Sequence, residues 1–188
     1  MNHHFSFRAA AVLIAASSLL ACQMPGAAQA EDFVLTSPQF AAGASLPAEH
    51  VLQGFGCTGG NHSPALNWRG VPAGTQSLAL TVYDPDAPTG SGWWHWVVYN
   101  LPAETRSLPE AAGSGAGLPA GTLSGRNSAK GTIYIGPCPP TGTHRYFFKL
   151  YALDTTLNLS AGASKEEVLR AMDGHVLAQA ELMGRYAR

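Results

Sequence analysis

Three segments of the chain show the hydrophobic pattern of buried β-strands. They are residues 77–83 (SLALTVY), residues 94–99 (WHWVVY) and residues 146–153 (YFFKLYAL). Each segment alternates or is continuously apolar, is rich in aromatic and β-branched residues, and has the length of a strand. These three segments are therefore predicted as the central strands of a sheet. Weaker strand patterns, each bounded by Gly, Pro or Asn, cover residues 33–35, 66–68 and 132–135.

The C-terminal segment has the pattern of a helix. Ser164 and Glu167 are spaced as a capping box, in which each side chain accepts the backbone N–H of the other residue. Apolar residues then recur at helical spacing as far as Met183. Gly174 divides this stretch, and Gly184 stands where a glycine commonly ends a helix. The pattern predicts helix over about 165–183, in one or two pieces.

Composition agrees with one mainly β domain. The chain has 188 residues, of which 46% are hydrophobic and only 12% are charged, against about 25% charged in an average soluble protein. Disorder and coiled coil are therefore poor interpretations, and the chain is long enough for one full core. The 21 glycines and 13 prolines lie between short apolar runs, so they predict many turns, with residues 111–125 as a long loop. We predict a β-sandwich or curled sheet with peripheral helices.

Residues 1–30 have the features of a secretory signal. Arg8 is their single charged residue, and residues 9–21 form an apolar run too short to span a bilayer. Two cleavage sites remain open: Leu19 to Cys22 resembles a lipobox, which would lipidate Cys22, and Ala28-Gln29-Ala30 is an A-x-A site. Both place the folded domain, residues 31–188, outside the cytoplasm. It would be periplasmic or secreted, or anchored to the cell envelope by a lipid on Cys22.

Charge and cysteine content limit the partners of this domain. Without residues 1–30 it carries 10 Lys and Arg against 12 Asp and Glu, a net charge of −2, so nothing favours nucleic acid. A membrane would be contacted only through the lipid at Cys22. Cys57 and Cys138 are expected to form one structural disulfide in an oxidising compartment. The alternatives are a reactive thiol or a thiolate metal ligand, but no CxxC or close Cys-His pair is present. We expect no metal and no other cofactor.

Two polar clusters could carry chemistry. The first begins with DPDAP at residues 84–88 and continues to His95, which lies within WWHW. Taken alone, Asp84 and Asp86 could simply cap turns, and His95 could be an ordinary buried histidine. The second cluster is the Gly/Pro-rich stretch 136–143 followed by HRY at residues 144–146.

Strand alternation separates the polar residues of the second cluster. His144 and Tyr146 should face one side of their strand, and Arg145 should face the other, where it could hold a carboxylate. Histidine and tyrosine donors beside a glycine-containing loop would suit an oxyanion such as a phosphate or a carboxylate.

These motifs resemble the phosphatidylethanolamine-binding protein family, also called Raf kinase inhibitor-like proteins, and in particular its bacterial branch. The resemblance rests on DPDAP with WWHWVVYNLP, on GPCPP with HRYFFKLYALD, and on the supporting stretches 61–68 and 174–180. It extends from about residue 33 to residue 186 and implies a large central antiparallel-rich sheet packed on a smaller one, with helices at the C-terminus. It also implies a small pocket for phosphate-like or acetate-like anions. The implied pocket residues are Asp84, Asp86, His95, Gly136, Pro139, Pro140, His144 and Tyr146.

Some parts of the sequence qualify this transfer. Asp86, Arg145 and the tryptophans at positions 93, 94 and 96 are better explained as structural. Residues 127–135 lack an Asp and two Gly that bacterial relatives usually carry, so the loop over the pocket could differ. Two aspartates would repel an anion, unless Asp84 accepts an N–H from His95 or His144 and so favours the protonated imidazole. Binding should then strengthen as the pH falls.

The functional hypothesis is an exported, non-catalytic binding protein that recognises a small phosphorylated or carboxylated ligand. The resemblance also allows inhibition or modulation of another protein, which for an exported chain would be an envelope protein. The alternative is a phosphoester or ester hydrolase in which Asp84 and His95 or His144 act as acid and base. A lipid-binding role is a third interpretation, although the polar pocket suits a head group better than acyl chains.

Overall fold

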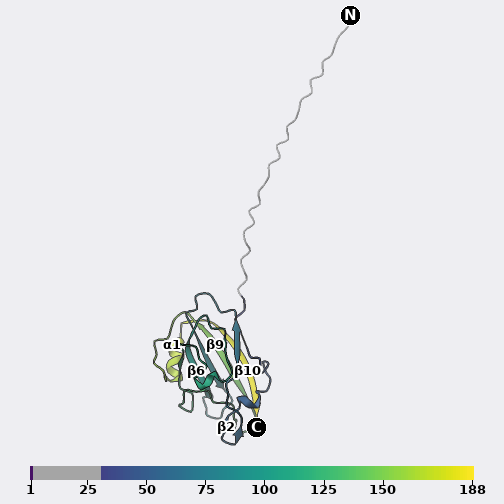
Figure 1. The fold of residues 1–188 in the computed structure, drawn as a ribbon, viewed down its shortest axis with the longest axis vertical. Coiled ribbons are helices and arrows are strands. Elements are labelled where there is room, and N and C mark those ends of the chain that lie inside the picture. The colour runs from purple at the N-terminus through teal and green to yellow at the C-terminus, as the bar shows by residue number, and fades with distance from the viewer. Residues whose placement is uncertain (2–30) are drawn as a thin grey trace.

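Strands dominate the molecule, as the hydrophobic pattern predicts. The structure, a computed structural model, describes Met1 and residues 31–188, so the predicted signal segment and Cys22 lie outside the described residues. The elements in chain order are β1 (Val34–Thr36), η1 (Ala48–His50), β2 (Gln53–Gly54), β3 (Cys57–Thr58), β4 (Leu66–Arg69), β5 (Ser77–Asp84), β6 (Trp93–Pro102), β7 (Ser107–Leu108), η2 (Ala112–Ser114), β8 (Leu123–Ser124), β9 (Thr143–Leu153), α1 (Lys165–Met172) and β10 (Val176–Ala187), and Figure 1 shows their arrangement. The mainly β fold class is confirmed.

The central layer is a five-stranded antiparallel sheet. Its strand order is β10-β9-β5-β6-β8, so the three strongest sequence patterns form the three adjacent strands β9, β5 and β6. The middle strand, β5, is buried along almost its whole length. A strand covered on both faces needs apolar residues at successive positions, which explains its nearly continuous hydrophobic run.

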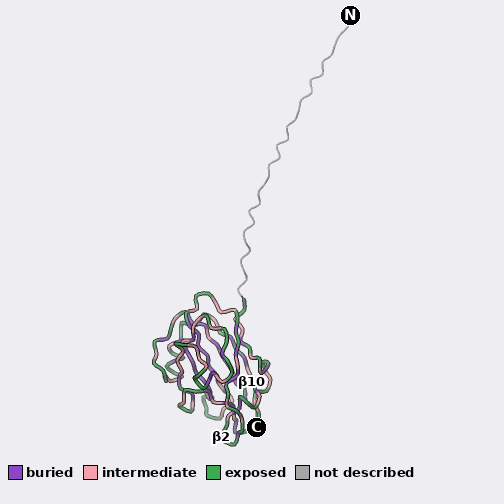
Figure 2. Tube along the Cα trace, in the orientation of Figure 1, coloured by how far each residue is buried: buried purple, intermediate pink, exposed green. Residues whose placement is uncertain are grey.

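Each face of this sheet has its own core. A three-stranded sheet, β1-β4-β7, supplies Leu35, Leu66 and Trp68 to the larger core, which they share with alternate residues of the central strands. On the opposite face, α1 contributes Val168 and Met172 to a smaller core. Figure 2 shows the buried segments running through the middle of the molecule, under exposed loops. A large sheet packed on a smaller one is thus confirmed.

The predicted C-terminal helix is correct only in its first part. The capping box forms, because Ser164 Oγ accepts the Glu167 N–H while the Glu167 carboxylate accepts the Ser164 N–H. The helix α1 then ends at Met172, before Gly174, which has a φ of 78°. The prediction of helix beyond residue 174 is wrong, since residues 176–187 form β10.

Pairing with a long neighbour explains this error. β10 pairs with β9 along its length, from Val176 opposite Leu153 to Ala187 opposite Thr143. Ala180 and Leu182 of β10 turn into the larger core. Gly184 does not end a helix, because it lies within β10, close against Leu46 and Phe40. Burial and sheet pairing therefore outweigh the helix propensity of Ala, Leu, Glu and Met.

The weaker strand patterns gave mixed results. Residues 34–36 and 66–69 are strands, close to the predicted 33–35 and 66–68. The prediction for residues 132–135 is wrong, since this segment forms no strand. Its backbone instead bonds to two separate elements, with the N–H of Tyr134 donated to Gly113 O and the N–H of Ile135 donated to His95 O. These bonds tie the segment to η2 and to β6. Among the described residues, no helix has the length and apolar character needed to cross a membrane.

Candidate functional site

Three predicted site residues share one face of the five-stranded sheet. Asp84 is the last residue of β5, and Tyr146 lies next to it on β9, because Tyr83 pairs with Phe147 in the preceding register position. His144 is two residues before Tyr146 and faces the same side, while Arg145 is exposed, as strand alternation predicts. Asp84, His144 and Tyr146 are all nearly inaccessible to solvent.

An irregularity in β6 brings a fourth residue to this face. Val82 pairs with Trp96 but Tyr83 pairs with Trp94, so His95 is an extra residue on the β6 side. Such a bulge turns a side chain away from the regular alternation. The His95 ring consequently meets the Tyr146 ring edge-on, with centroids 5.2 Å apart. The sequence motif contains His95, but only the bulge turns it toward His144 and Tyr146.

Asp84 and His144 form a buried pair. His144 Nδ1 lies 2.7 Å from Asp84 Oδ2, and the two side chains are 8% and 4% exposed. The other carboxylate oxygen, Oδ1, accepts the backbone N–H of Asp86 at 2.8 Å. Since a carboxylate accepts, His144 Nδ1 carries the proton, and a second proton on Nε2 would make His144 a cation balanced by Asp84. Of the two histidines proposed as partners of Asp84, the structure selects His144.

His95 is held in a different state. Its Nδ1 lies 2.7 Å from the carbonyl oxygen of Ile135, so Nδ1 donates, and Nε2 is buried without a hydrogen-bond partner among residues 31–188. Burial lowers the pKa of His95 to about 4, against opposing effects of the Ile135 carbonyl and of Asp84. His95 is therefore neutral near pH 7, and Nε2 carries a lone pair.

Tyr146 supplies an unused hydroxyl. Its oxygen is buried and makes no hydrogen bond within the described chain. Burial, followed by the negative charge of Asp84, raises the pKa of this phenol above its ordinary value. Tyr146 is therefore a neutral hydroxyl at any physiological pH and can donate its proton to an acceptor.

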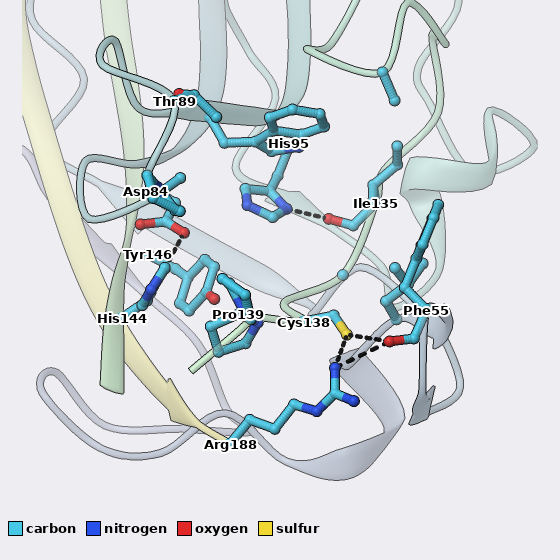
Figure 3. A pocket seen from close by; sticks show the side chains of 17 residues that line it. Phe55, Asp84, Thr89, His95, Ile135, Cys138, Pro139, His144, Tyr146 and Arg188 are labelled. Carbon is cyan, nitrogen blue, oxygen red and sulfur yellow. Dashed lines mark hydrogen bonds and ion pairs between the residues drawn. The ribbon is translucent and has the colours of Figure 1, made fainter. Parts of the chain in front are cut away.

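These groups line a cavity of about 440 Å³. Figure 3 shows His95 and Tyr146 facing the same space, with Asp84 and His144 joined at its side. Seven of the eight sequence-predicted residues line it: Asp84, His95, Gly136, Pro139, Pro140, His144 and Tyr146. The sequence analysis did not name the other lining residues as site residues; they are Leu52, Phe55, Ala87, Pro88, Thr89, Trp93, Ala129, Ile135, Cys138 and Arg188. Ala87, Pro88, Trp93 and Cys138 lie within the motifs that carry the family resemblance, and Ala129 and Ile135 lie in the loop 127–135. No motif includes Leu52, Phe55, Thr89 or Arg188, which come from separate segments of the chain.

Asp86 is the predicted site residue that does not line the cavity. Its carboxylate forms a two-pronged ion pair with the Arg145 guanidinium, at 2.9 Å to Nε and 2.7 Å to NH2, and also accepts the Arg145 N–H. Hydrogen bonding to Arg145 lowers the pKa of Asp86 from 3.8 to about 2. As proposed from the sequence, Asp86 is better explained as structural, since it joins the loop after β5 to the start of β9.

The Gly/Pro-rich loop forms part of the cavity wall, and contacts with distant segments hold it in place. Cys138 forms the predicted disulfide with Cys57 of β3, and the carbonyl oxygen of Pro137 accepts the N–H of Leu52 at 3.1 Å. At Gly136 a Cβ atom would overlap the backbone of residues 50–52, so only glycine fits this close approach. The Arg188 side chain donates to Phe55 O at 2.9 Å (Figure 3). This wall is assembled from segments that are distant in sequence.

The altered loop at residues 127–135 also borders the site. Ala129 and Ile135 line the cavity, and the Asn127 side chain holds the loop by accepting the N–H of Gly131 at 3.0 Å and donating to Ile133 O at 2.8 Å. Within residues 31–188, no group of three or more His, Cys, Asp or Glu is placed to hold a metal ion. The polar side chains that line the cavity are the imidazoles of His95 and His144, the Asp84 carboxylate, the Tyr146 phenol, the Arg188 guanidinium and the Thr89 hydroxyl.

Comparisons with known proteins agree with this architecture. A family model described as phosphatidylethanolamine-binding protein matches residues 36–187. YbcL of Escherichia coli (strain K12), named as a UPF0098 protein, is 48% identical over 160 residues, which cover 82% of this chain and 87% of YbcL. A UPF0098 protein of Methanothermobacter thermautotrophicus is 52% identical over 134 residues, which cover 71% of this chain and 88% of that protein.

Two solved structures extend the similarity to three dimensions. The crystal structure of E. coli YbcL, described as a new member of the mammalian PEBP family, matches with a TM-score of 0.80 and 45% identity, over 84% of this chain and 99% of YbcL. The structure of a Chlamydia trachomatis protein, described as a homologue of phosphatidylethanolamine-binding proteins, matches with a TM-score of 0.73 and 41% identity, over 83% and 97% of the two chains. The family match includes every cavity-lining residue except Arg188.

Proposed function

Because the chain belongs to the phosphatidylethanolamine-binding protein family, we propose that it is an exported, non-catalytic binding protein whose cavity holds a small ligand with a phosphate or carboxylate group. Family membership by itself does not identify a ligand, since one fold hosts many functions. The proposal therefore rests on the chemistry of the cavity.

The buried Asp84–His144 pair is the observation that carries the proposal. A lone buried carboxylate would repel an anion, but the charge of Asp84 is matched when His144 is doubly protonated. His144 Nε2 then becomes a donor, and the free Tyr146 hydroxyl is a second donor in the same cavity. Arg188 adds a positive charge to the lining. Such donors suit an oxyanion in a site of limited solvent access.

Export is supported by the cysteines of the folded domain. Cys57 and Cys138 are joined in a disulfide, and disulfides persist mainly in oxidising compartments outside the cytoplasm. The N-terminal signal pattern supports the same location. The two routes, release after Ala30 or lipid attachment at Cys22, would be separated by the mass of the N-terminal fragment of the mature protein.

Calorimetric titration with inorganic phosphate and with acetate tests the binding role. We expect saturable binding that is tighter at about pH 5.5 than at about pH 7.5. The reason is that His144 donates from Nε2 only when it is doubly protonated. Asp84→Asn and His144→Ala should each weaken binding at least about tenfold, the effect of losing one charge-assisted hydrogen bond.

A matched control uses the other histidine–aspartate pair. His175 Nδ1 lies 2.8 Å from Asp154 Oδ1, but these side chains are about half exposed and do not line the cavity. Asp154→Asn should therefore leave phosphate and acetate binding unchanged. Absence of binding in the parent protein would refute the proposal. Steady hydrolysis of p-nitrophenyl phosphate that disappears in His144→Ala would instead favour the hydrolase alternative.

A further inference from the structure

The unpartnered nitrogen of His95 places a hydrogen-bond acceptor in the cavity. The carbonyl oxygen of Ile135 can only accept, so the 2.7 Å contact requires the proton to be on His95 Nδ1. Nε2 is buried and has no partner among the described residues. A buried acceptor without a donor is costly, and in native structures such an atom calls for an explanation. The His95 ring lines the cavity, so a ligand can supply the missing donor.

The surroundings of His95 keep this nitrogen unprotonated. The titratable groups facing it are Asp84 on β5, His144 and Tyr146 on β9, and Arg188 across the cavity. Asp84 favours a cationic His95, but its charge is already shared with His144. Burial has the largest effect and opposes protonation, in line with the lowered pKa of His95. When His144 is doubly protonated, its Nε2 and the Tyr146 hydroxyl are donors in the same cavity as the acceptor at His95 Nε2.

This combination selects for a particular form of the ligand. Building on the proposed function, we infer that the cavity binds an acid group that keeps one proton, whose O–H donates to His95 Nε2 while its charged oxygens accept from His144 and Tyr146. A phosphate monoester with a single negative charge has this arrangement. A phosphodiester has the same charge but no O–H, so it would leave Nε2 unpaired. His95 is thus a specificity-determining residue of the cavity.

Methyl phosphate and dimethyl phosphate form a matched pair of probes. At about pH 5 both carry one negative charge, because the second ionisation of a phosphate monoester has a pKa of about 6. They differ in one methyl group and in the presence of the P–O–H donor. We expect methyl phosphate to bind at least about tenfold tighter in calorimetric titration, since sites with buried hydrogen-bonding groups reject analogues that leave them unpaired.

Two variants separate selection from general anion binding. His95→Gln replaces the fixed acceptor by an amide that can both donate and accept, so the affinity ratio of the two probes should fall toward one. Tyr146→Phe removes a donor that serves both probes, so both affinities should fall while their ratio is kept. Thermal unfolding of each variant would verify that the fold is intact. Nitrogen NMR of the parent should place the His95 proton on Nδ1.

The outcomes distinguish this inference from the proposed function. Equal binding of the two probes, or an unchanged ratio in His95→Gln, would leave an anion-binding cavity and overturn the inference. A proton on Nε2 in the NMR spectrum would also overturn it. If methyl phosphate, dimethyl phosphate and inorganic phosphate all fail to bind, the inference fails, and if acetate also fails to bind, the proposed function fails with it.

Discussion

The disulfide should contribute a large part of the stability of this domain. Cys57 and Cys138 are separated by 81 residues, so their bond closes more than half of residues 31–188 into one loop. With a loop of this length, the chain-entropy relation gives a stabilisation of about 4.5 kcal/mol at room temperature. The double variant Cys57→Ala with Cys138→Ala removes the bond without leaving an unpaired thiol at either site. We expect it to lose about 2 to 4.5 kcal/mol of unfolding free energy.

Urea unfolding, followed by tryptophan fluorescence, measures this loss. The midpoint concentration should fall in the double variant, and the slope should change only as far as the unfolded chain becomes more expanded. In thermal unfolding, about 2 to 4 °C per kcal/mol in a domain of this size predicts a Tm lower by roughly 4 to 18 °C. The parent protein treated with a reductant should match the double variant. A change below about 1 kcal/mol would refute the loop-entropy reasoning.

The same bond should also affect the cavity. It connects β3 to the Gly/Pro-rich loop, and Arg188 bridges Phe55 and Cys138 on the same wall. We therefore expect weaker phosphate binding in the double variant under conditions where it remains folded. Unchanged affinity would show that the remaining contacts of the loop, including that between Leu52 and Pro137, hold the wall in place.

Two further predictions concern the surroundings of the site. Gly136→Ala should cost about 1 to 3 kcal/mol of unfolding free energy, because the new methyl group overlaps the backbone of residues 50–52; Gly131→Ala, whose methyl group meets only the Asn127 amide at 3.6 Å, is the control. Arg145→Gln should raise the pKa of Asp86 from about 2 toward 3.8 in a carbon NMR titration. Because that pKa is lowered by folding, the pair stabilises the parent fully above about pH 4 and loses this effect as the pH falls toward 2. Equal stability of the two glycine variants, or an unshifted Asp86, would contradict these arguments.

The local sequence pattern correctly predicted those elements that are determined by residues close together in the chain. The strands β5, β6 and β9 were predictable because apolar residues fill them on one or both faces. The capping box of α1 was predictable because its hydrogen bonds join residues only three positions apart. The alternation of His144, Arg145 and Tyr146 was also readable, since the side chains of a strand point to opposite faces in turn.

Long-range contacts decided the elements that were predicted wrongly. β10 has the composition of a helix but a long partner in β9, and Ala180 and Leu182 alternate inward along it. Residues 132–135 have the composition of a strand, but their N–H groups bond to two different elements and no ladder forms. In both cases the backbone hydrogen bonds that decide the structure join residues distant in the chain, so a local window contains too little information.

The sequence by itself determined the chemistry available to this protein: the family, the polar motifs, and the opposite faces taken by His144 and Arg145. Only the tertiary structure decided how that chemistry is distributed. It assigned Asp84 to His144, left Asp86 to Arg145 outside the cavity, and used a bulge and the Ile135 carbonyl to set the proton of His95. The physical reason is that residue types set which hydrogen bonds are possible, whereas burial and distance between remote segments select the ones that form.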